Sequence, residues 1–257
     1  TGTVESIPLI ASSIMSKKIA EGAGALVLDV KVGSGAFMKD LAAARELAAT
    51  MVQLGAAHGV RTVAMLTDMS TPLGHAVGNA VEVTESLAVL AGGGPPDVVE
   101  LTLLLAREML DAAGLPHADP GKALASGAAM DCWRSMIRAQ GGDPDAPLPV
   151  AREIETVRAD RAGVIAAVDA YRIGSAAWRL GAGRARQGDP VSPAAGVMLR
   201  ARPGDRVVPG DPLFELRTDD GARIPAALAV VAGAVTVADV APRPRPLLLG
   251  RIDQAGR

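Results

Sequence analysis

The chain has 257 residues, a length that suits one large domain or two of modest size. Its formal net charge of −2 provides no broad surface for binding nucleic acid or other polyanions. A single cysteine, Cys132, excludes an internal disulfide and any zinc site built from several cysteines. No apolar run reaches the length of a membrane span and no secretory signal is evident, so we expect a cytoplasmic globular protein.

The first part of the chain alternates between helical and strand-like patterns. Residues 1–20 predict a helix with Thr3 as its N-cap, and the Glu-Gly-Ala-Gly run at 21–24 ends it. The apolar run 25–30 is typical of a buried parallel strand. The elements expected after it are a helix at 41–58, a strand at 61–67, and helices at 79–91 and 96–113. The strand–helix–strand order predicts a right-handed βαβ unit.

Beyond residue 150 the pattern changes to short strand-like runs. They lie at 154–158, 163–168, 196–200 and 212–216, with a helix at 173–180 among them. The turn at 204–211 resembles that of biotinyl and lipoyl carrier domains, but no lysine follows Lys122, which excludes a swinging-arm carrier. Cys132 lies in a helical stretch at 122–140 and is expected to be a small buried residue.

The first predicted helix carries a candidate binding face. Ile10, Ser13, Ile14 and Lys17 recur at spacings of three and four, which places them on one side of a helix. A hydroxyl and a cation among aliphatic side chains could hold a flat polar ring, with the ammonium beside a carbonyl oxygen. An amphipathic helix with a surface lysine explains the same pattern, so the spacing by itself leaves both interpretations open.

A glycine-containing loop, Asp29-Val-Lys-Val-Gly-Ser-Gly-Ala-Phe37, follows the first predicted strand. Such loops often bind phosphate or nucleotides. Met38 stands where the dinucleotide-binding fingerprint needs its third glycine, so a Rossmann fold is disfavoured. Lys31 directly follows the apolar run, and we expect it at the strand end, near a cleft. The three histidines are far apart in the sequence, and no pattern typical of a Ser-His-Asp catalytic triad can be recognised.

Long segments, taken together, resemble the thymidine and pyrimidine nucleoside phosphorylases. They are Thr3–Lys18, Leu28–Lys39, Thr67–Val83 and Leu180–Ala185, and they occur in the family's order. The resemblance runs through nearly the whole chain. It implies reversible phosphorolysis for pyrimidine salvage, in which a pyrimidine nucleoside and phosphate give the free base and an α-pentose 1-phosphate. Thymidine is the first candidate substrate, and uridine and deoxyuridine are further candidates.

The resemblance also implies a fold and an assembly. The fold is a mixed-sheet α/β phosphorylase domain, with the remnant of an N-terminal helical domain and a C-terminal α+β domain of the hammerhead or β-sandwich type. The expected division is the last helix of the helical domain at 1–20, a hinge at 21–24, the α/β core at 25–150 and the C-terminal domain at 151–257. We expect a homodimer, and the packing partners of the first helix would lie upstream of this chain.

The family's base site can be carried over by position. Ser13 and Lys17 match its pyrimidine-binding serine and lysine. The residues that match its apolar pocket around the base are Val4, Ile10, Ile14 and Phe37. Because negative charge builds on the departing base, Lys17 is the expected catalytic residue, acting as a preorganised cation.

Other components of the family's chemistry are less complete in this sequence. In the potassium-binding branch, the cation ligands match the backbone oxygens of Leu73 and Ala76 and the carboxylate of Glu85. No organic cofactor is implied, inorganic phosphate is the co-substrate, and neither nucleic acid nor a membrane is an expected partner. The family's base-binding arginine and phosphate-binding segments have no counterpart here, so we expect the isolated chain to be inactive.

Two rival classes of function stay open. The first is a phosphoribosyltransferase of the anthranilate type, which shares this kind of fold and transfers the sugar in the opposite sense. The second is a non-catalytic binding or assembly fragment. The helix that carries Ser13 and Lys17 favours the phosphorylase over the transferase.

Overall fold

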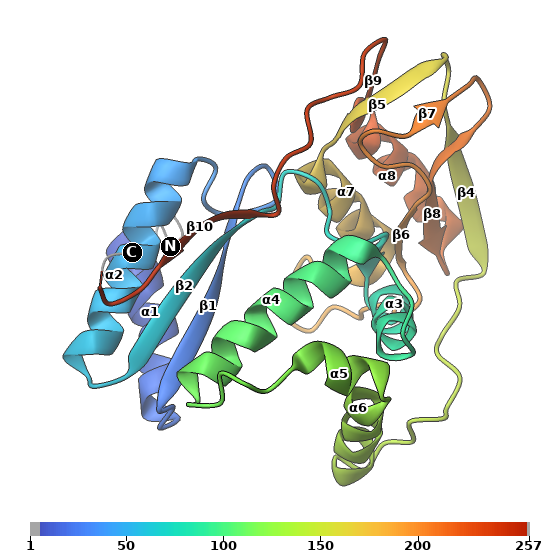
Figure 1. The fold of residues 1–257 in the computed structure, drawn as a ribbon. Coiled ribbons are helices and arrows are strands. Elements are labelled where there is room, and N and C mark those ends of the chain that lie inside the picture. The colour runs from blue at the N-terminus through green and yellow to red at the C-terminus, as the bar shows by residue number, and fades with distance from the viewer. Residues whose placement is uncertain (1–5, 256–257) are drawn as a thin grey trace. The chain divides into compact units, whose positions relative to one another are not determined.

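The computed structural model describes residues 6–255, in which helices accompany several small sheets (Figure 1). By its backbone contacts the chain divides into two compact units, which are described one at a time. The first unit contains the described residues up to 70, residues 100–121 and those from 245 onward. The second contains residues 71–99 and 122–244. Each unit is therefore assembled from separate stretches of sequence.

The first unit has a three-stranded mixed sheet in the order β1-β2-β10. β1 (Ala25–Val32) and β2 (Arg61–Asp68) pair in parallel along their whole length. The connection between them is α2 (Leu41–Ala57), which confirms the predicted βαβ unit. β10 (Leu248–Ile252), which the sequence pattern did not indicate, pairs antiparallel with β2 and makes the sheet mixed.

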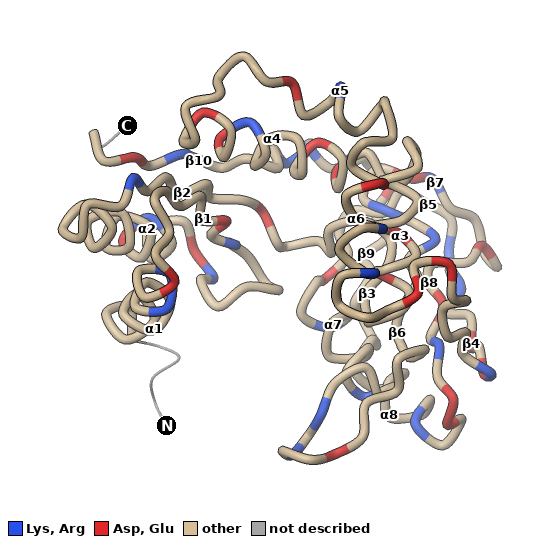
Figure 2. The backbone as a smooth tube through the Cα atoms, turned by 90° about the horizontal axis from the view of Figure 1, so that it is seen from below, with Lys and Arg blue, Asp and Glu red and all other residues tan. Residues whose placement is uncertain are grey.

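Helices cover both faces of this sheet (Figure 1 and Figure 2). α1 (Ile7–Ala20) and α2 lie on one face, and α4 (Pro96–Ala112) lies on the other from Glu100 onward. The carboxylate of Asp40 caps α2 by accepting a hydrogen bond from the backbone N–H of Ala43 at 2.9 Å. Basic and acidic residues are interspersed along the chain rather than gathered on one element (Figure 2), as the small net charge suggests.

The first helix packs into the core of this unit. Ala11 and Met15, which lie one helical turn apart, are buried in the same apolar cluster as Leu47 of α2. Ile10, which is partly buried, packs against the same cluster, so Ile10 and Ile14 extend the apolar face of the helix that Ala11 and Met15 begin. Packing partners of this helix also lie within the chain, since α2 and the sheet supply them.

The second unit combines antiparallel sheets with helices, the α+β character expected of the C-terminal domain. One sheet has the order β3-β6-β8-β4 and the other β7-β5-β9. The strands are β3 (Ala76–Gly78), β4 (Glu153–Arg158), β5 (Gly163–Val168), β6 (Gly196–Leu199), β7 (Arg206–Val207), β8 (Pro212–Thr218) and β9 (Val235–Ala238). The remaining helices are α3 (Ala80–Leu90), α5 (Pro120–Ala125), α6 (Ala128–Ala139), α7 (Ala170–Ala177) and α8 (Ile224–Val231), with a π-helical turn at Trp178–Ala182 and a 3-10 turn at Gly221–Arg223.

The core of the second unit is aliphatic around one aromatic ring. Phe214, Leu216 and Thr218 of β8 alternate toward the interior, while Glu215 and Arg217 between them stay partly exposed. The strand-like run predicted at 212–216 lies within this strand. The cluster around Phe214 draws on β5, β6, α7 and α8, so one core joins both sheets to the helices.

Several expectations differ from the structure. The division by backbone contacts does not coincide with the predicted boundary at residue 150, which stays a prediction: residues 71–99 and 122–150 group with the second unit, where β3 pairs with β6. The helical stretch at 122–140 is broken at Gly127, whose φ of 83° is left-handed. Cys132 is exposed rather than buried. Thr3, the expected helix cap, lies outside the described residues, and the hinge at 21–24 stays a prediction.

Candidate functional site

An apolar hollow of about 260 Å³ lies at the carboxyl end of β1. Its wall consists of Ile10, Ile14, Leu28, Asp29, Val30, Lys31, Phe37, Met38, Leu47 and Met51. These residues come from α1, β1, the loop after β1 and α2, all within the first unit. The carboxyl ends of parallel strands are where α/β sheets commonly bind ligands. The expected position of Lys31, at a strand end beside a cleft, is confirmed.

The structure brings part of the predicted base site together. Ile10, Ile14 and Phe37 come from two separate segments and line the same hollow. The side chain of Phe37 is 75% exposed and that of Ile14 is 36% exposed, so both have surface left to cover a ligand. An aromatic ring and branched aliphatic groups around a small hollow suit one face and one edge of a flat heterocycle.

The polar residues of the predicted site lie on the same helix but outside the wall of the hollow. Ser13 and Lys17 are exposed on α1, one turn apart, and neither lines the hollow. Lys18, by contrast, is paired with Glu21 at 3.0 Å. Val4, the remaining predicted residue, lies outside the described residues.

The loop that carries Phe37 is held against the segment after β2. Gly33 has a φ of 131°, and a Cβ there would lie 2.4 Å from Ser70 Oγ and 2.6 Å from its backbone nitrogen. Only glycine permits this approach without displacement of the backbone. The N–H of Gly35 donates to the carbonyl of Met69 at 2.9 Å, so the loop is tied to its neighbour at a second point.

A partly buried charged group forms the polar end of the hollow. Lys31 Nζ lies 2.7 Å from Asp29 Oδ2 and donates to Thr67 Oγ1 at 3.1 Å. The Thr67 hydroxyl, which is fully buried, donates in turn to Asp29 Oδ1. The charges of Lys31 and Asp29 cancel, so the group offers directed hydrogen bonds without a net charge. Sequence reasoning singled out Lys31 but missed both partners, although each lies near the carboxyl end of a predicted strand.

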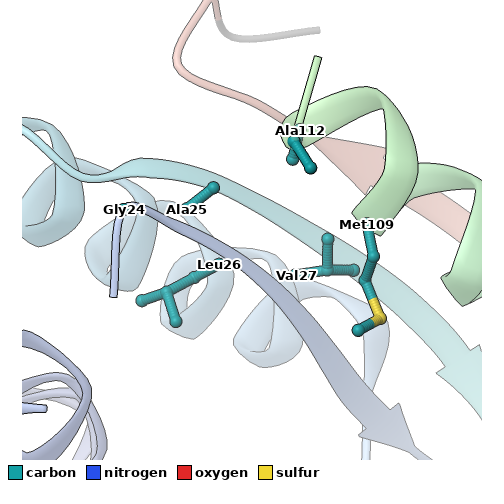
Figure 3. Close-up of a pocket in the computed structure, with 7 residues that line it drawn as sticks. Gly24, Ala25, Leu26, Val27, Met109 and Ala112 are labelled. Carbon is teal, nitrogen blue, oxygen red and sulfur yellow. The ribbon is translucent and has the colours of Figure 1, made fainter. Parts of the chain in front are cut away.

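A second and larger hollow in this unit lies at the amino end of β1 (Figure 3). Its volume is about 670 Å³, and it is lined by Gly24, Ala25, Leu26, Val27, Met109, Ala112 and Ala113. None of these side chains is titratable or can donate a hydrogen bond. A ligand site needs a few convergent polar groups in addition to apolar surface. The smaller hollow, which has them, is therefore the better candidate.

The predicted cation ligands lie in the second unit, where carboxylates capture a run of backbone N–H groups. Glu85 Oε2 accepts from the N–H of His75 at 2.7 Å and from that of Ala76 at 3.1 Å. Glu82 Oε1 accepts from the N–H of Gly78 at 2.7 Å. The structure thus places the Glu85 carboxylate against the backbone N–H groups of His75 and Ala76, and the potassium assignment stays a prediction. It also reveals Glu82, which sequence reasoning did not consider.

Glu82 should make stability depend on pH. Burial raises the pKa of its carboxyl above the ordinary value, and the charge of Glu85 adds to this, against the opposing N–H of Gly78. A carboxyl with a raised folded-state pKa contributes stability below its unfolded pKa, and that contribution is lost as the pH rises through the folded value. We therefore expect Glu82→Gln to gain stability relative to the wild type between about pH 4 and about pH 8.

Urea unfolding at both pH values measures this gain. The exposed Glu155→Gln on β4 is the matched control and should show no such change with pH. A difference between Glu82→Gln and wild type that stays constant, or that shrinks toward high pH, would contradict the assignment.

Other kinds of site are not evident in the part of the chain that the structure describes. Within residues 6–255, no group of three or more His, Cys, Asp or Glu side chains is placed to hold a metal ion. No helix in that range is both long enough and apolar enough to cross a membrane. The ring of His58 contacts the carbonyl of Leu54 at 2.9 Å, an ordinary helix-terminal contact.

Comparison with known proteins gives two family matches and several close relatives. Residues 1–130 match the a/b domain of a glycosyl transferase family, and residues 164–238 match the pyrimidine nucleoside phosphorylase C-terminal domain. Thymidine phosphorylase of Mycobacterium tuberculosis (strain H37Rv) is 60% identical over 252 residues, which are 98% of this chain and 59% of the relative. Pyrimidine-nucleoside phosphorylase of Bacillus subtilis (strain 168) is 48% identical over 227 residues, 84% of this chain and 52% of the relative.

A further relative extends the same pattern. Pyrimidine-nucleoside phosphorylase of Geobacillus stearothermophilus is 47% identical over 227 residues, with 84% of this chain and 52% of the relative covered. The chain therefore spans between about half and three-fifths of the length of the relatives it matches.

Proposed function

The chain belongs to the thymidine and pyrimidine nucleoside phosphorylase family, and from this premise we propose that it contributes the nucleobase site of a pyrimidine nucleoside phosphorylase. The reaction is the reversible phosphorolysis of thymidine, and of uridine and deoxyuridine, to the free base and α-(deoxy)ribose 1-phosphate. The observation that supports this most directly is the apolar hollow lined by Ile10, Ile14 and Phe37. Ile10 and Ile14 belong to α1, the helix that also carries Ser13 and Lys17.

The base would lie in the hollow with its faces against apolar side chains. Phe37 covers one side of the hollow, and Ile10 and Ile14 contact the ring and its C5 substituent. The bound base and these side chains together would exclude water, so hydrogen bonds at the edge of the hollow would gain strength. Ser13 would hold the ring by a hydrogen bond near N3 or a carbonyl oxygen, and Lys17 would lie beside a ring carbonyl. A methyl group at C5 adds apolar contact, which favours thymine over uracil modestly.

The reaction needs no nucleophile from the protein. The bond between C1′ and the ring nitrogen breaks with its electron pair on the base, and the sugar becomes oxocarbenium-like. An oxygen of hydrogen phosphate then bonds to C1′, and the proton that the phosphate group carried passes to the anionic base. Lys17 stabilises the charge that builds on the base, an interaction that is stronger in the transition state than in the substrate.

Phosphate would be bound by groups other than those of the hollow. Lys31 is the cation that lines it, and Asp29 at 2.7 Å neutralises that charge. A dianion beside this pair would face the Asp29 carboxylate at close range, which disfavours binding. We therefore propose that the 257-residue chain by itself holds the base but does not carry out phosphorolysis.

Potassium is the proposed cation of the second unit, and the donors present fit it. The carbonyl of His75 accepts from Leu199 of β6 at 2.7 Å, so the N–H and C=O of the next residue, Ala76, face the opposite edge of β3. Glu85 lies on that edge, because it accepts from the N–H of Ala76. An oxygen set of one carboxylate and the carbonyls of Ala76 and Leu73 suits a hard cation. Bound there, potassium would offset the negative charge of Glu85 and Glu82.

We also propose that the active protein is a cytoplasmic homodimer.

A chimera tests the proposed function. The part of the Mycobacterium tuberculosis thymidine phosphorylase that this chain does not cover would be fused to the whole of this chain. We expect thymine release from thymidine that depends on phosphate and comes close to the rate of the parent relative. A chimera that folds but releases no base would refute the function, provided that the parent relative is active in the same assay.

The chain without the fused part supplies the second arm. Calorimetric titration with thymine and uracil should detect binding, and incubation with thymidine and phosphate should release no base. Turnover by the chain alone at a rate near that of the chimera would refute the account of where phosphate binds. Absence of base binding to both the chain and the chimera would refute the assignment of the hollow.

A further inference from the structure

We propose that Arg202 is a positioning residue that orders the segment Thr71–Gly78, which carries the backbone ligands of the proposed cation site. The inference rests on the proposed function only for the identity of the cation. Ordering of the segment by Arg202 follows from contacts within the second unit and can be tested without substrate.

The guanidinium of Arg202 joins three acceptors that lie far away in sequence. It donates to the carbonyl oxygens of Gly74 and Pro72, the latter at 3.3 Å. The nitrogen that contacts Pro72 also donates to Asp97 Oδ2 at 2.7 Å. The side chains of Arg202 and Asp97 are 24% and 26% exposed, and Pro72 and Gly74 are buried. These are charge-assisted contacts in a largely shielded place, where they are stronger than at an open surface.

Carboxylates hold the other side of the same segment. Asp97 Oδ2 accepts from the N–H of Gly74 at 3.1 Å, and Glu85 accepts from the N–H groups of His75 and Ala76. Gly74 has a left-handed φ of 69°, and a Cβ there would lie 2.1 Å from Glu85 Oε1. Carboxylate and guanidinium together therefore determine the backbone direction on both sides of Gly74.

These contacts also determine where the Leu73 carbonyl points. In a trans peptide, the C=O of one residue and the N–H of the next point in opposite directions. Because the N–H of Gly74 points to Asp97, the C=O of Leu73 points away from Asp97. Arg202 fixes the peptide groups on both sides by binding the carbonyls of Pro72 and Gly74. Without Arg202, Asp97 would lose its counter-charge and the Leu73 carbonyl would be free to turn.

Arg202 is suited to this role by shape as well as charge. A planar guanidinium has five N–H donors in a fixed fork and can bond to two carbonyls and a carboxylate together. A lysine ammonium at the same place is a point charge on a flexible stem and cannot reproduce that geometry. The local charge also requires a cation, because Glu82, Glu85 and Asp97 all bond to the same short segment.

Hydrogen exchange of the backbone amides measures the ordering directly. In Arg202→Ala and in Arg202→Lys we expect the amides of Gly74, His75 and Ala76 to exchange about 10- to 100-fold faster, the factor associated with loss of charged hydrogen bonds. Arg200→Ala is the matched control. Arg200 pairs with Glu215 at 2.7 Å and is 40% exposed, so its loss should leave exchange in the segment unchanged. Slow exchange of the Leu216 amide in β8 shows that the core is intact in each variant.

Chemical rescue separates positioning from simple packing. Millimolar guanidinium chloride, far below denaturing concentrations, should restore slow exchange in Arg202→Ala, whereas equal sodium chloride should not. Unchanged exchange in Arg202→Ala, full protection in Arg202→Lys, or equal rescue by sodium would each overturn the proposal. If Arg202→Ala does not fold, Arg202→Lys carries the test against the same control.

The cation is tested in a separate arm. Slower exchange in the segment with potassium than with sodium, in the chimera described above, supports the potassium assignment. If potassium has no effect while Arg202→Ala loses protection, the cation assignment fails and the role of Arg202 stands. If instead potassium slows exchange and Arg202→Ala keeps full protection, the role of Arg202 fails and the potassium assignment stands. Neither result bears on thymidine turnover by the chimera.

Discussion

Replacement of Lys17 by alanine is expected to lower kcat/KM for thymidine phosphorolysis by about 10- to 100-fold in the chimera, because the base departs with negative charge and a charge-assisted hydrogen bond is worth about 1.5–3 kcal/mol. Lys17 is exposed on α1, one helical turn after Ser13. Ile14 of the same helix lines the hollow together with Phe37. The loss should fall mainly on kcat, since the interaction strengthens as the base becomes anionic.

Lys18→Ala is the control for this measurement. It removes the same charge from the next position, about 100° around the helix, where the side chain is paired with Glu21 at 3.0 Å. We expect its kinetics to stay close to those of the parent. Wild-type kinetics in Lys17→Ala, or equal losses in both variants, would show that Lys17 does not contact the departing base.

Phe214→Ala is expected to destabilise the second unit by about 3–5 kcal/mol, a large part of the about 5–15 kcal/mol that stabilises a typical domain. Phe214 is 1% exposed and lies opposite Val157 and Leu199 in the sheet, so its removal leaves a cavity bounded by two neighbouring strands. The surrounding side chains are aliphatic and only partly able to collapse into that space.

Tryptophan fluorescence during urea unfolding measures this loss in the correct unit. Trp133 and Trp178, the two tryptophans of the sequence, both lie within the second unit. Val208→Ala, at a side chain that is 55% exposed, is the control and should change stability by no more than about 0.5 kcal/mol. A cost for Phe214→Ala as small as that of the control would mean that the described core is not the one that stabilises this unit.

Local periodicity was enough to predict most of the regular elements. β5 (Gly163–Val168) coincides with the predicted strand, and β1, β2 and α2 differ from prediction by two residues or fewer at their ends. Each of these segments has a pattern that its own residues carry, either an apolar run or alternation. The fold class followed from their order and from the resemblance.

Elements that depend on a distant partner were missed. β10 is a short run whose pairing with β2 crosses nearly the whole intervening chain, and nothing within Leu248–Ile252 specifies that partner. α8 (Ile224–Val231) is apolar along its whole length, so it has no periodic pattern to distinguish it from a buried strand. The two contact-based units are made of separate stretches of sequence for the same reason, because they follow from long-range pairings.

The contacts at the candidate sites could likewise be predicted from the sequence only in part. Phe37, Ile10 and Ile14 could be grouped from a resemblance between long segments, and the structure places them around one hollow. The grouping of Arg202 with Asp97 could not be predicted, since 105 residues separate them and neither belongs to a recognisable motif. Contacts of this kind depend on the fold having formed.

The position of β10 has a consequence for the order in which the two units fold during synthesis. The three-stranded sheet described for the first unit forms only when residues 248–252 have reached β2, and Arg251 then pairs with Glu108 of α4 at 3.2 Å. All residues of the second unit, which ends at 244, leave the ribosome before that strand does. The unit that begins second along the chain can therefore finish folding first, the reverse of the usual N-to-C order. Until then the nascent chain displays an unpaired edge of β2, and a stop codon before residue 248 would make that exposed edge permanent.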